Sequence, residues 1–219
     1  MGMDEQEVKG IIISTAPQGE YGRRVKILTD KLGKITAFAS GAAKANSKLI
    51  GTLRPMTSAR FKLAEGRGAY NIHGAEVMDA FDDLAFDFET SVYAMYVLEA
   101  GDYFSEEGMP EAEAKSLLNL MFMTMKALRE KRLYEPLITS IYELRLLVLQ
   151  GEYTMMPPIV RNERTVDIWQ RCISSPLTSL YDADYFDELD TDEFIANVKL
   201  LFDRQVKHKF RTLDVLKKL

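Results

Sequence analysis

Residues 23–40 read RRVKILTDKLGKITAFAS, two runs rich in Val, Ile, Thr and Phe on either side of a short polar segment. Apolar and polar residues partly alternate in both runs, which is the period expected of a β-strand that buries one face. Between the runs, Gly33 supplies a residue that tolerates positive φ in a tight turn. The segment therefore predicts a β-hairpin.

Three further strands are predicted around this hairpin. They are VKGIIIS (8–14) before it, and SARFKLA (58–64) and AYNIHGAEV (69–77) after it. The intervening GAAKANSKLIGTLRP (41–55) is too long for a hairpin turn, and we expect it to be partly helical. Five short strands with such an insertion favour a small closed barrel, with the oligonucleotide/oligosaccharide-binding (OB) fold as the leading candidate.

The hydrophobic period changes to that of helices after about residue 80. Helices are expected over 82–104, 110–132 and 136–151, near Trp169, and from a capping box of Asp190 and Glu193 to about His208. The predicted fold class is α+β, a five-stranded OB barrel followed by an all-α C-terminal domain. We expect a nucleic-acid-binding OB domain over residues 1–80 and a helical domain with a basic C-terminal tail over residues 81–219.

Charge is divided unevenly along the chain. The net charge is −5, whereas residues 23–54 hold eight Lys or Arg and a single acid, Asp30. A basic surface on an acidic protein indicates a localised anionic ligand, because attraction by total charge is absent. Lys and Arg neutralise phosphates, and the candidate DNA-binding residues are Arg23, Arg24, Lys26, Lys34, Lys44 and Lys48.

Two further features bear on nucleic-acid binding. Basic residues return in the C-terminal tail, at Arg204, Lys207, Lys209, Arg211, Lys217 and Lys218. Four aromatic residues of the barrel could stack on unpaired bases if they face a groove, namely Tyr21, Phe38, Phe61 and Tyr70. Phe38 and Phe61 alternate with polar neighbours, which favours the barrel core for both.

Catalytic and metal-binding patterns are not found in the sequence. With two histidines, His73 and His208, and one cysteine, Cys172, the chain has neither a disulfide framework nor a cysteine-rich zinc site. It contains no P-loop signature. We therefore expect no catalytic residues, no metal and no cofactor. The N-terminus lacks the pattern of a secretory signal, and no apolar run approaches the roughly 20 residues that span a bilayer, so we expect a cytoplasmic protein without a membrane partner.

The order of residues over positions 9–81 resembles the N-terminal domain of RecO, a family of bacterial recombination mediators. The points of resemblance are Gly19-Glu20, Leu28-Thr29, Gly33-Lys34, Gly41-Ala42, Ser47, Lys48, Leu53, Pro55 and Gly66. The ending HKFRTLDVL, residues 208–216, is similar to the basic, apolar tail of this family. The resemblance implies an OB fold, a helical domain and a noncatalytic role in recombinational DNA repair, and with it a nucleoid-associated protein.

The resemblance also implies partners. RecO proteins bind single- and double-stranded DNA, anneal complementary strands, interact with RecR and single-strand-binding protein, and help RecA to load. By the family pattern, Arg23, Lys34, Lys44 and Lys48 match basic sites. The acidic C-terminal peptide of single-strand-binding protein is expected in a groove at the apolar helical segments 117–128 and 142–150, flanked by Arg129, Lys131 or Arg132.

Two departures from the family pattern qualify these expectations. Ser40, Ala43 and Asn46 stand where many relatives carry basic residues, so the insertion is less positive than usual. Many relatives have a four-cysteine zinc site where this chain has Cys172 alone, so we expect no zinc and instead packing around Trp169 and Ile173. The alternative function is a protein-interaction scaffold whose barrel has little nucleic-acid affinity, and an uncharacterised enzyme is the third class.

Overall fold

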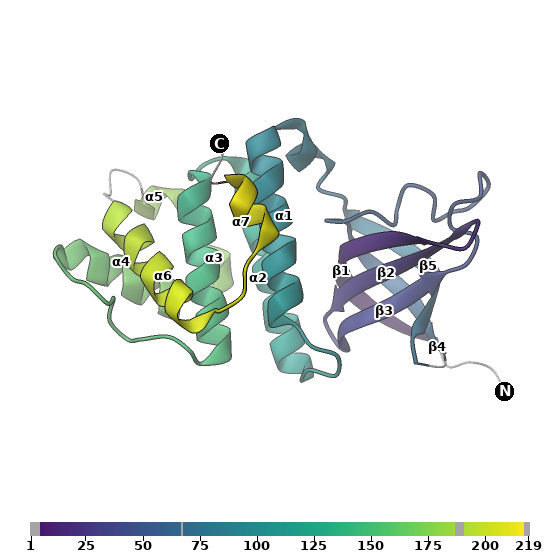
Figure 1. Ribbon diagram of the computed structural model, residues 1–219, viewed down its shortest axis with the longest axis horizontal. Coiled ribbons are helices and arrows are strands. Elements are labelled where there is room, and N and C mark those ends of the chain that lie inside the picture. Colours follow the sequence, from purple (N-terminus) through teal and green to yellow (C-terminus); the bar gives the residue numbers. More distant parts are fainter. Residues whose placement is uncertain (1–4, 67, 187–190, 217–219) are drawn as a thin grey trace. The chain divides into compact units, whose positions relative to one another are not determined.

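A computed structural model describes residues 5–66, 68–186 and 191–216. The chain divides into two compact units. The first comprises residues 1–82 with 98–118, and the second comprises residues 83–97 with 119–219. The first unit contains the β-strands, and the second contains most of the helical residues (Figure 1).

The first unit is built on a closed five-stranded barrel, as predicted. The strands are β1 (Glu5–Gln18), β2 (Gly22–Thr29), β3 (Gly33–Ala39), β4 (Ser58–Glu65) and β5 (Tyr70–Asp79). Their order around the barrel is β1-β2-β3-β5-β4, and β4 pairs with β1 to close it. Neighbouring strands are antiparallel except β3 and β5, which pair in parallel at two positions, Ala37 with Tyr70 and Phe38 with Asn71. The predicted α+β fold class is thereby confirmed.

Alternation along the strands fills the barrel interior. In β3, Ile35, Ala37 and Ala39 are buried while the residues between them are partly exposed. Phe61 of β4 is fully buried and joins Val25 and Ile27 of β2 in the same hydrophobic core. A small barrel has room for only a few large side chains, so the alanines of β3 suit an interior that already holds Phe61.

The segment between β3 and β4 is a succession of turns. The described backbone over residues 41–55 contains no helix, so the prediction of a partly helical insertion is wrong. Gly41 and Gly51 have φ of 67° and 75°, outside the helical region. Ala42 and Leu53 are buried in the barrel core, so both ends of the segment are fixed against the strands.

The helical segments predicted after about residue 80 are confirmed. The helices are η1 (Asp82–Phe86), α1 (Phe88–Phe104), α2 (Glu111–Glu130), α3 (Glu135–Gln150), α4 (Glu163–Ser174), η2 (Leu177–Ser179), α5 (Ala183–Phe186), α6 (Asp192–Gln205) and α7 (Arg211–Leu216). Within the second unit, α3 packs against α4 and α6. The domain boundary predicted at residues 80 and 81 stays a prediction. The division into compact units instead assigns part of α1 and part of α2 to each unit.

The start of α6 differs in detail from the expected capping box. Thr191 is the N-cap residue and its side chain makes no capping hydrogen bond. The Glu193 carboxylate accepts hydrogen bonds from the backbone N–H groups of Arg161 and Asn162, at 2.8 and 3.3 Å. Asp190, the predicted cap, lies outside the described residues.

A network of side chains surrounds Cys172 at the end of α4. One guanidinium nitrogen of Arg145 donates to the backbone carbonyls of Cys172, Ile173 and Ser175, at 3.2, 2.9 and 3.2 Å. Trp169 is fully buried, and its indole N–H donates to the Thr154 carbonyl at 2.8 Å. Arginine thus satisfies the carbonyls that a helix leaves free at its C-terminus. Trp169 is packed in the interior, as expected, and Arg145 also stabilises the end of α4 through its hydrogen bonds.

Candidate nucleic-acid interface

Four of the six candidate cations gather where β2 begins and β3 ends. Arg23 and Arg24 pair in register with Ala39 and Phe38 of β3. Lys44 and Lys48 lie in the turns that follow β3, which a hydrogen bond from Ala43 N–H to the Tyr21 carbonyl (3.0 Å) ties to the β1–β2 turn. We call Arg23, Arg24, Lys44 and Lys48 the open cluster.

The open cluster is accessible and not neutralised by acids. Arg24, Lys44 and Lys48 are exposed and Arg23 is partly exposed. Within the described part of the chain, none of the four forms an ion pair with a carboxylate. Cations that no carboxylate neutralises attract a polyanion. The cluster is therefore suited to bind phosphates.

Tyr21 borders the open cluster. Its side chain is 45% exposed, and Lys44 Nζ lies 5.7 Å from the centroid of its ring, within the range of a cation–π contact. A hydrogen bond with Glu20 and, to a smaller extent, desolvation raise the pKa of the Tyr21 hydroxyl. Glu20 is the acid nearest in sequence to Arg23 and Arg24.

The other two candidates, Lys26 and Lys34, face an acid. Lys26 Nζ lies 2.7 Å from one carboxylate oxygen of Asp102 on α1, and Lys34 Nζ lies 3.1 Å from the other. Lys34 Nζ also donates to the Asp102 backbone carbonyl at 2.6 Å. Burial acts to raise the pKa of Asp102, but hydrogen bonds and charges from the two lysines lower it overall. We call these three residues the paired cluster.

The aromatic candidates divide between the interior and the outer face. Phe61 is in the core as predicted, and Tyr70 packs against that core. The prediction that Phe38 is in the core is wrong, because Phe38 belongs to the partly exposed set of β3 and is neither in the core cluster nor packed against it. Tyr21 is exposed, and Phe38 and Tyr70 are both partly exposed.

Comparison with known proteins decides the family. Residues 3–81 match the family model described as "Recombination protein O N terminal". Proteins named "DNA repair protein RecO" are similar over a longer stretch: that of Listeria monocytogenes is 30% identical over 152 residues, covering 69% of this chain and 58% of the relative. That of Alkaliphilus metalliredigens is 29% identical over 145 residues, covering 66% and 58%. The chain belongs to the RecO family. It spans about three fifths of the length of the RecO proteins it matches.

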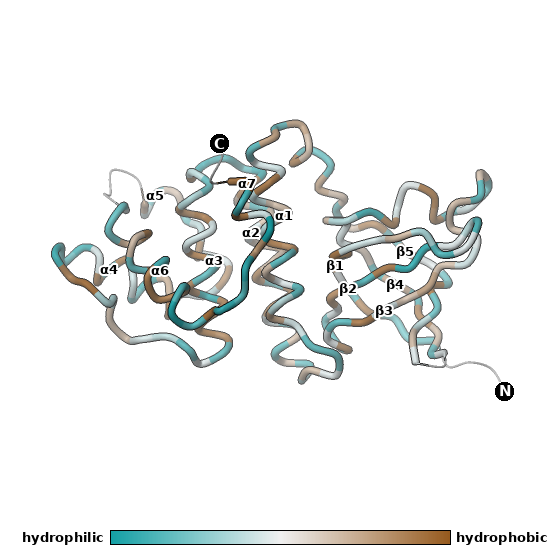
Figure 2. Tube along the Cα trace, viewed as in Figure 1, coloured by the Kyte–Doolittle hydropathy of each residue, from teal (hydrophilic) through white to brown (hydrophobic). Residues whose placement is uncertain are grey.

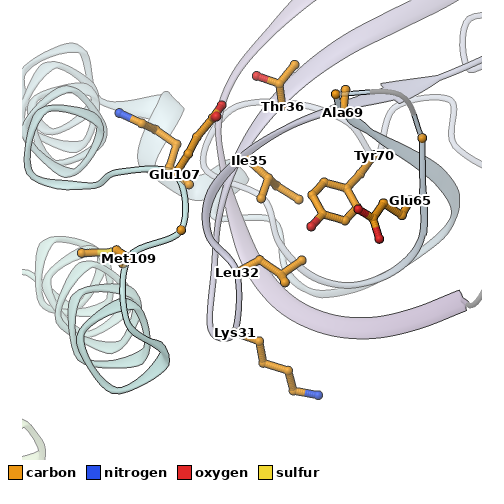
Figure 3. Close-up of a pocket in the computed structure, with 13 residues that line it drawn as sticks. Lys31, Leu32, Ile35, Thr36, Glu65, Ala69, Tyr70, Glu107 and Met109 are labelled. Atoms are coloured by element: carbon orange, nitrogen blue, oxygen red, sulfur yellow. The ribbon is translucent and has the colours of Figure 1, made fainter.

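A cavity of this RecO-family barrel lies at the opposite end of β3 from the open cluster. It has a volume of about 370 Å³ and includes Leu32, Ile35 and Tyr70 in its wall (Figure 3). Charges of both signs line it, with Lys31 and Lys34 as cations and Glu65 and Glu107 as anions. Because these charges offset one another, the cavity does not favour a phosphate over other ligands.

The candidate partner-binding cations of the RecO-family helical unit are already paired. Arg129 lies 3.7 Å from Asp83, Lys131 lies 3.6 Å from Asp87 and Arg132 lies 2.6 Å from Asp184. Arg132 also lines a cavity of about 360 Å³ together with Leu137 and Phe186. An acidic peptide at this place would have to displace carboxylates from these cations, although apolar wall residues are available for its side chains.

The basic tail is mostly hydrophilic before α7 (Figure 2), although its Val206 and Phe210 are buried, and its charge is partly neutralised. Lys209 forms an ion pair with Asp214 at 3.0 Å, and Lys207 Nζ donates to the Asp203 carbonyl at 3.0 Å. Lys217 and Lys218 lie outside the described residues. Nearby, burial raises the pKa of Glu143 to about 7, although a hydrogen bond from the Tyr96 hydroxyl (2.6 Å) lowers it.

The described part of the chain shows neither a metal-binding cluster nor a membrane-spanning helix. No group of three His, Cys, Asp or Glu residues there is arranged to hold a metal ion. The absence of zinc stays a prediction, which elemental analysis of the purified protein checks. Burial raises the pKa of the Cys172 thiol to about 12, so it is not ionised near neutral pH. No helix among these residues is both long and apolar enough to cross a bilayer.

Two features of the interface could not be found by inspecting the sequence. Asp102 neutralises Lys26 and Lys34 from positions 76 and 68 residues away, and no local signal links it to the barrel. The outward position of Phe38 is the second, because alternation alone does not tell which set of residues faces the interior.

Proposed function

We propose that this protein is a noncatalytic mediator of recombinational DNA repair that binds single- and double-stranded DNA through the open cluster. The observation that carries the proposal is the set of four accessible cations without carboxylate partners among the described residues. Membership of the RecO family supports the role in repair, since the relatives are named DNA repair proteins.

The chemistry of the open cluster supports phosphate binding rather than base reading. Lys44 and Lys48 are point charges in turns, and Arg23 and Arg24 project from a strand end. Such groups attract the phosphate backbone irrespective of sequence and release condensed counterions on binding. A protein that handles many different DNA strands during repair needs contacts of this kind.

The finer role follows the family. Strand annealing, RecA loading with RecR, and binding of the acidic C-terminal peptide of single-strand-binding protein are part of the proposal. The cavity beside Arg132 is the place we assign to that peptide. Calorimetry at low salt with the wild-type protein and with Arg132→Ala tests the assignment, and equal affinities would exclude it.

The salt dependence of DNA affinity tests the main proposal. Four phosphate contacts predict a slope of about −2.8 for the logarithm of single-strand affinity against the logarithm of salt concentration, at about −0.7 per contact. Raising the salt from about 50 to 200 mM then weakens binding roughly 50-fold. Replacing Arg23, Arg24, Lys44 and Lys48 together with Ala should bring the slope close to zero without preventing folding, because exposed charges contribute little to stability.

A matched control separates the open cluster from general charge. Lys9 and Lys62 are exposed cations on β1 and β4 of the same barrel. The variant Lys9→Ala/Lys62→Ala removes as much charge as Lys44→Ala/Lys48→Ala but should leave the slope almost unchanged. If the wild-type protein binds neither single nor double strands, the protein-interaction scaffold becomes the better description.

A further inference from the structure

We propose that Phe38, supported by Arg24, is a base-stacking residue that makes the barrel distinguish single-stranded from double-stranded DNA. This inference rests on the proposed DNA-binding function and adds a specificity determinant to it. Stacking and phosphate binding are different interactions, so each can be removed while the other is retained.

Phe38 is a large apolar side chain that does not face the barrel interior. It lies on the outer face of β3, two residues from Thr36, and the neighbouring inward residues Ala37 and Ala39 are buried. It belongs neither to the barrel core nor to the partly buried residues packed against that core. The part of the phenyl ring that remains in water costs free energy. A ligand that covers the ring would remove this cost.

The strand neighbours of Phe38 are polar and one is cationic. Arg24 of β2 pairs with it in register on one side, and Asn71 of β5 on the other. Side chains directly opposite on adjacent strands have Cβ atoms about 5 Å apart, so the ring and the guanidinium occupy adjoining positions on one face. Beyond Arg24 the next strand carries Ala16, whose small side chain leaves the face open.

This arrangement matches what an unpaired nucleotide requires. A base can stack on the ring of Phe38 while the guanidinium of Arg24 contacts its phosphate or adds a cation–π contact. Arg24 is exposed and, among the described residues, has no carboxylate partner that would hold it away. It also belongs to the open cluster, so a strand that follows those cations passes over Phe38.

Stacking on Phe38 is selective for single strands. In a duplex, each base is covered on both faces by its neighbours and paired at its edge, so the ring has no base face to contact. In a single strand every base has an available π-face, and the interaction tolerates any sequence. Phe38 should therefore add affinity for single strands alone.

The experiment compares Phe38→Ala with the wild-type protein on an oligothymidylate and on a duplex of the same length. We expect the single-strand affinity to fall about 5- to 100-fold and the duplex affinity to stay the same, as base–aromatic stacking predicts. The salt slope should not change, because no charge is removed. Phe38→Leu retains apolar volume without a π-face and should lose nearly as much single-strand affinity, which guards against a folding defect of the alanine variant.

Two further variants complete the design. Phe38→Trp should keep the single-strand affinity of the wild-type protein. The fluorescence that the introduced tryptophan adds to that of the buried Trp169 should be quenched by the oligothymidylate but not by the duplex. Tyr153→Ala removes a 37% exposed aromatic ring of the second unit and should change neither affinity.

The outcomes separate this inference from the proposed function. Equal losses on both DNA forms, or no loss on either, while Lys44→Ala/Lys48→Ala still flattens the salt slope, would overturn the role of Phe38 alone. A wild-type protein that binds neither DNA form would overturn the proposed function and this inference together.

Discussion

The open cluster and the paired cluster carry the same kinds of side chain on the same barrel, yet their surroundings differ. Arg23, Arg24, Lys44 and Lys48 have no carboxylate partner among the described residues, whereas Lys26 and Lys34 share the carboxylate of Asp102 at 2.7 and 3.1 Å. Lys26 is only two residues from Arg24 in β2. A single acid on a helix therefore changes what two of six neighbouring cations can do.

The comparison teaches that the number of basic residues in a segment does not tell how many of them are free to bind phosphates. The count of eight basic residues over positions 23–54 includes three whose charge is offset inside the same unit, namely Lys26, Lys34 and Arg54. Phosphates displace counterions from unpaired cations easily, but they must break two short ion pairs to reach Lys26 and Lys34. The paired cluster is better explained as a structural contact that holds the end of α1 against the barrel.

The largest expected effect separates the two clusters directly. Lys44→Met/Lys48→Met should flatten the salt slope for single strands by about 1.4 and lower affinity roughly 60-fold at 50 mM salt, if affinities converge near 1 M. Lys26→Met/Lys34→Met removes the same charge and should change the slope by less than one contact, about 0.7. Fluorescence anisotropy over a salt series measures both. Equal slopes for the two double variants would abolish the distinction between the clusters.

A smaller effect is expected when the acid of the paired cluster is neutralised. Asp102→Asn frees Lys26, while Lys34 keeps its hydrogen bond to the Asp102 backbone carbonyl. We expect one additional phosphate contact, a slope steeper by about 0.7 and affinity higher by roughly 8-fold at 50 mM salt. The free energy of unfolding should fall by about 1–2 kcal/mol, between the values typical of exposed and buried ion pairs.

Both readouts of Asp102→Asn are needed. Urea unfolding gives the stability change, and anisotropy gives the affinity change. A variant that is less stable but binds DNA with unchanged affinity would mean that Lys26 points away from the DNA path. An unchanged stability would mean that the paired cluster does not fasten the barrel to α1.

The sequence predicted the barrel because its signals are local. Alternation in β3 and the positive φ of 66° at Gly33 concern residues within a few positions of one another. A Cβ at Gly33 would lie 2.6 Å from the carbonyl oxygen of Glu106, so glycine also permits the close approach of the α1–α2 connection. Hairpins and strands of this kind follow from turn chemistry and period, which a single sequence contains.

The parts that were wrong or missed depend on distant neighbours. Phe38 was assigned to the core because it alternates with polar neighbours, but the small Ala37 and Ala39 of the same strand face inward, into the core that also holds Phe61. The insertion was expected to be partly helical, yet burial of Ala42 and Leu53 fixes it as turns. These outcomes are decided by tertiary packing, which overrides local preference.

The smallest expected effect is the response of the paired cluster to acid. Lys26 and Lys34 lower the pKa of Asp102 from its ordinary value of 3.8, so the folded protein holds this carboxylate ionised more strongly than the unfolded chain does. The resulting stability is fully present above about pH 4 and is lost as the pH falls through the lowered pKa of the folded state. The free energy of unfolding should therefore differ between the wild-type protein and Asp102→Asn by a constant amount near neutral pH, and this difference should shrink below the ordinary value of 3.8. Because Asn does not titrate, the difference between the two proteins cancels the other carboxylates. Urea unfolding at a series of pH values from neutral to acid measures it, and a difference that stays constant or grows toward acid would show that ionised Asp102 is not what stabilises the contact with the barrel.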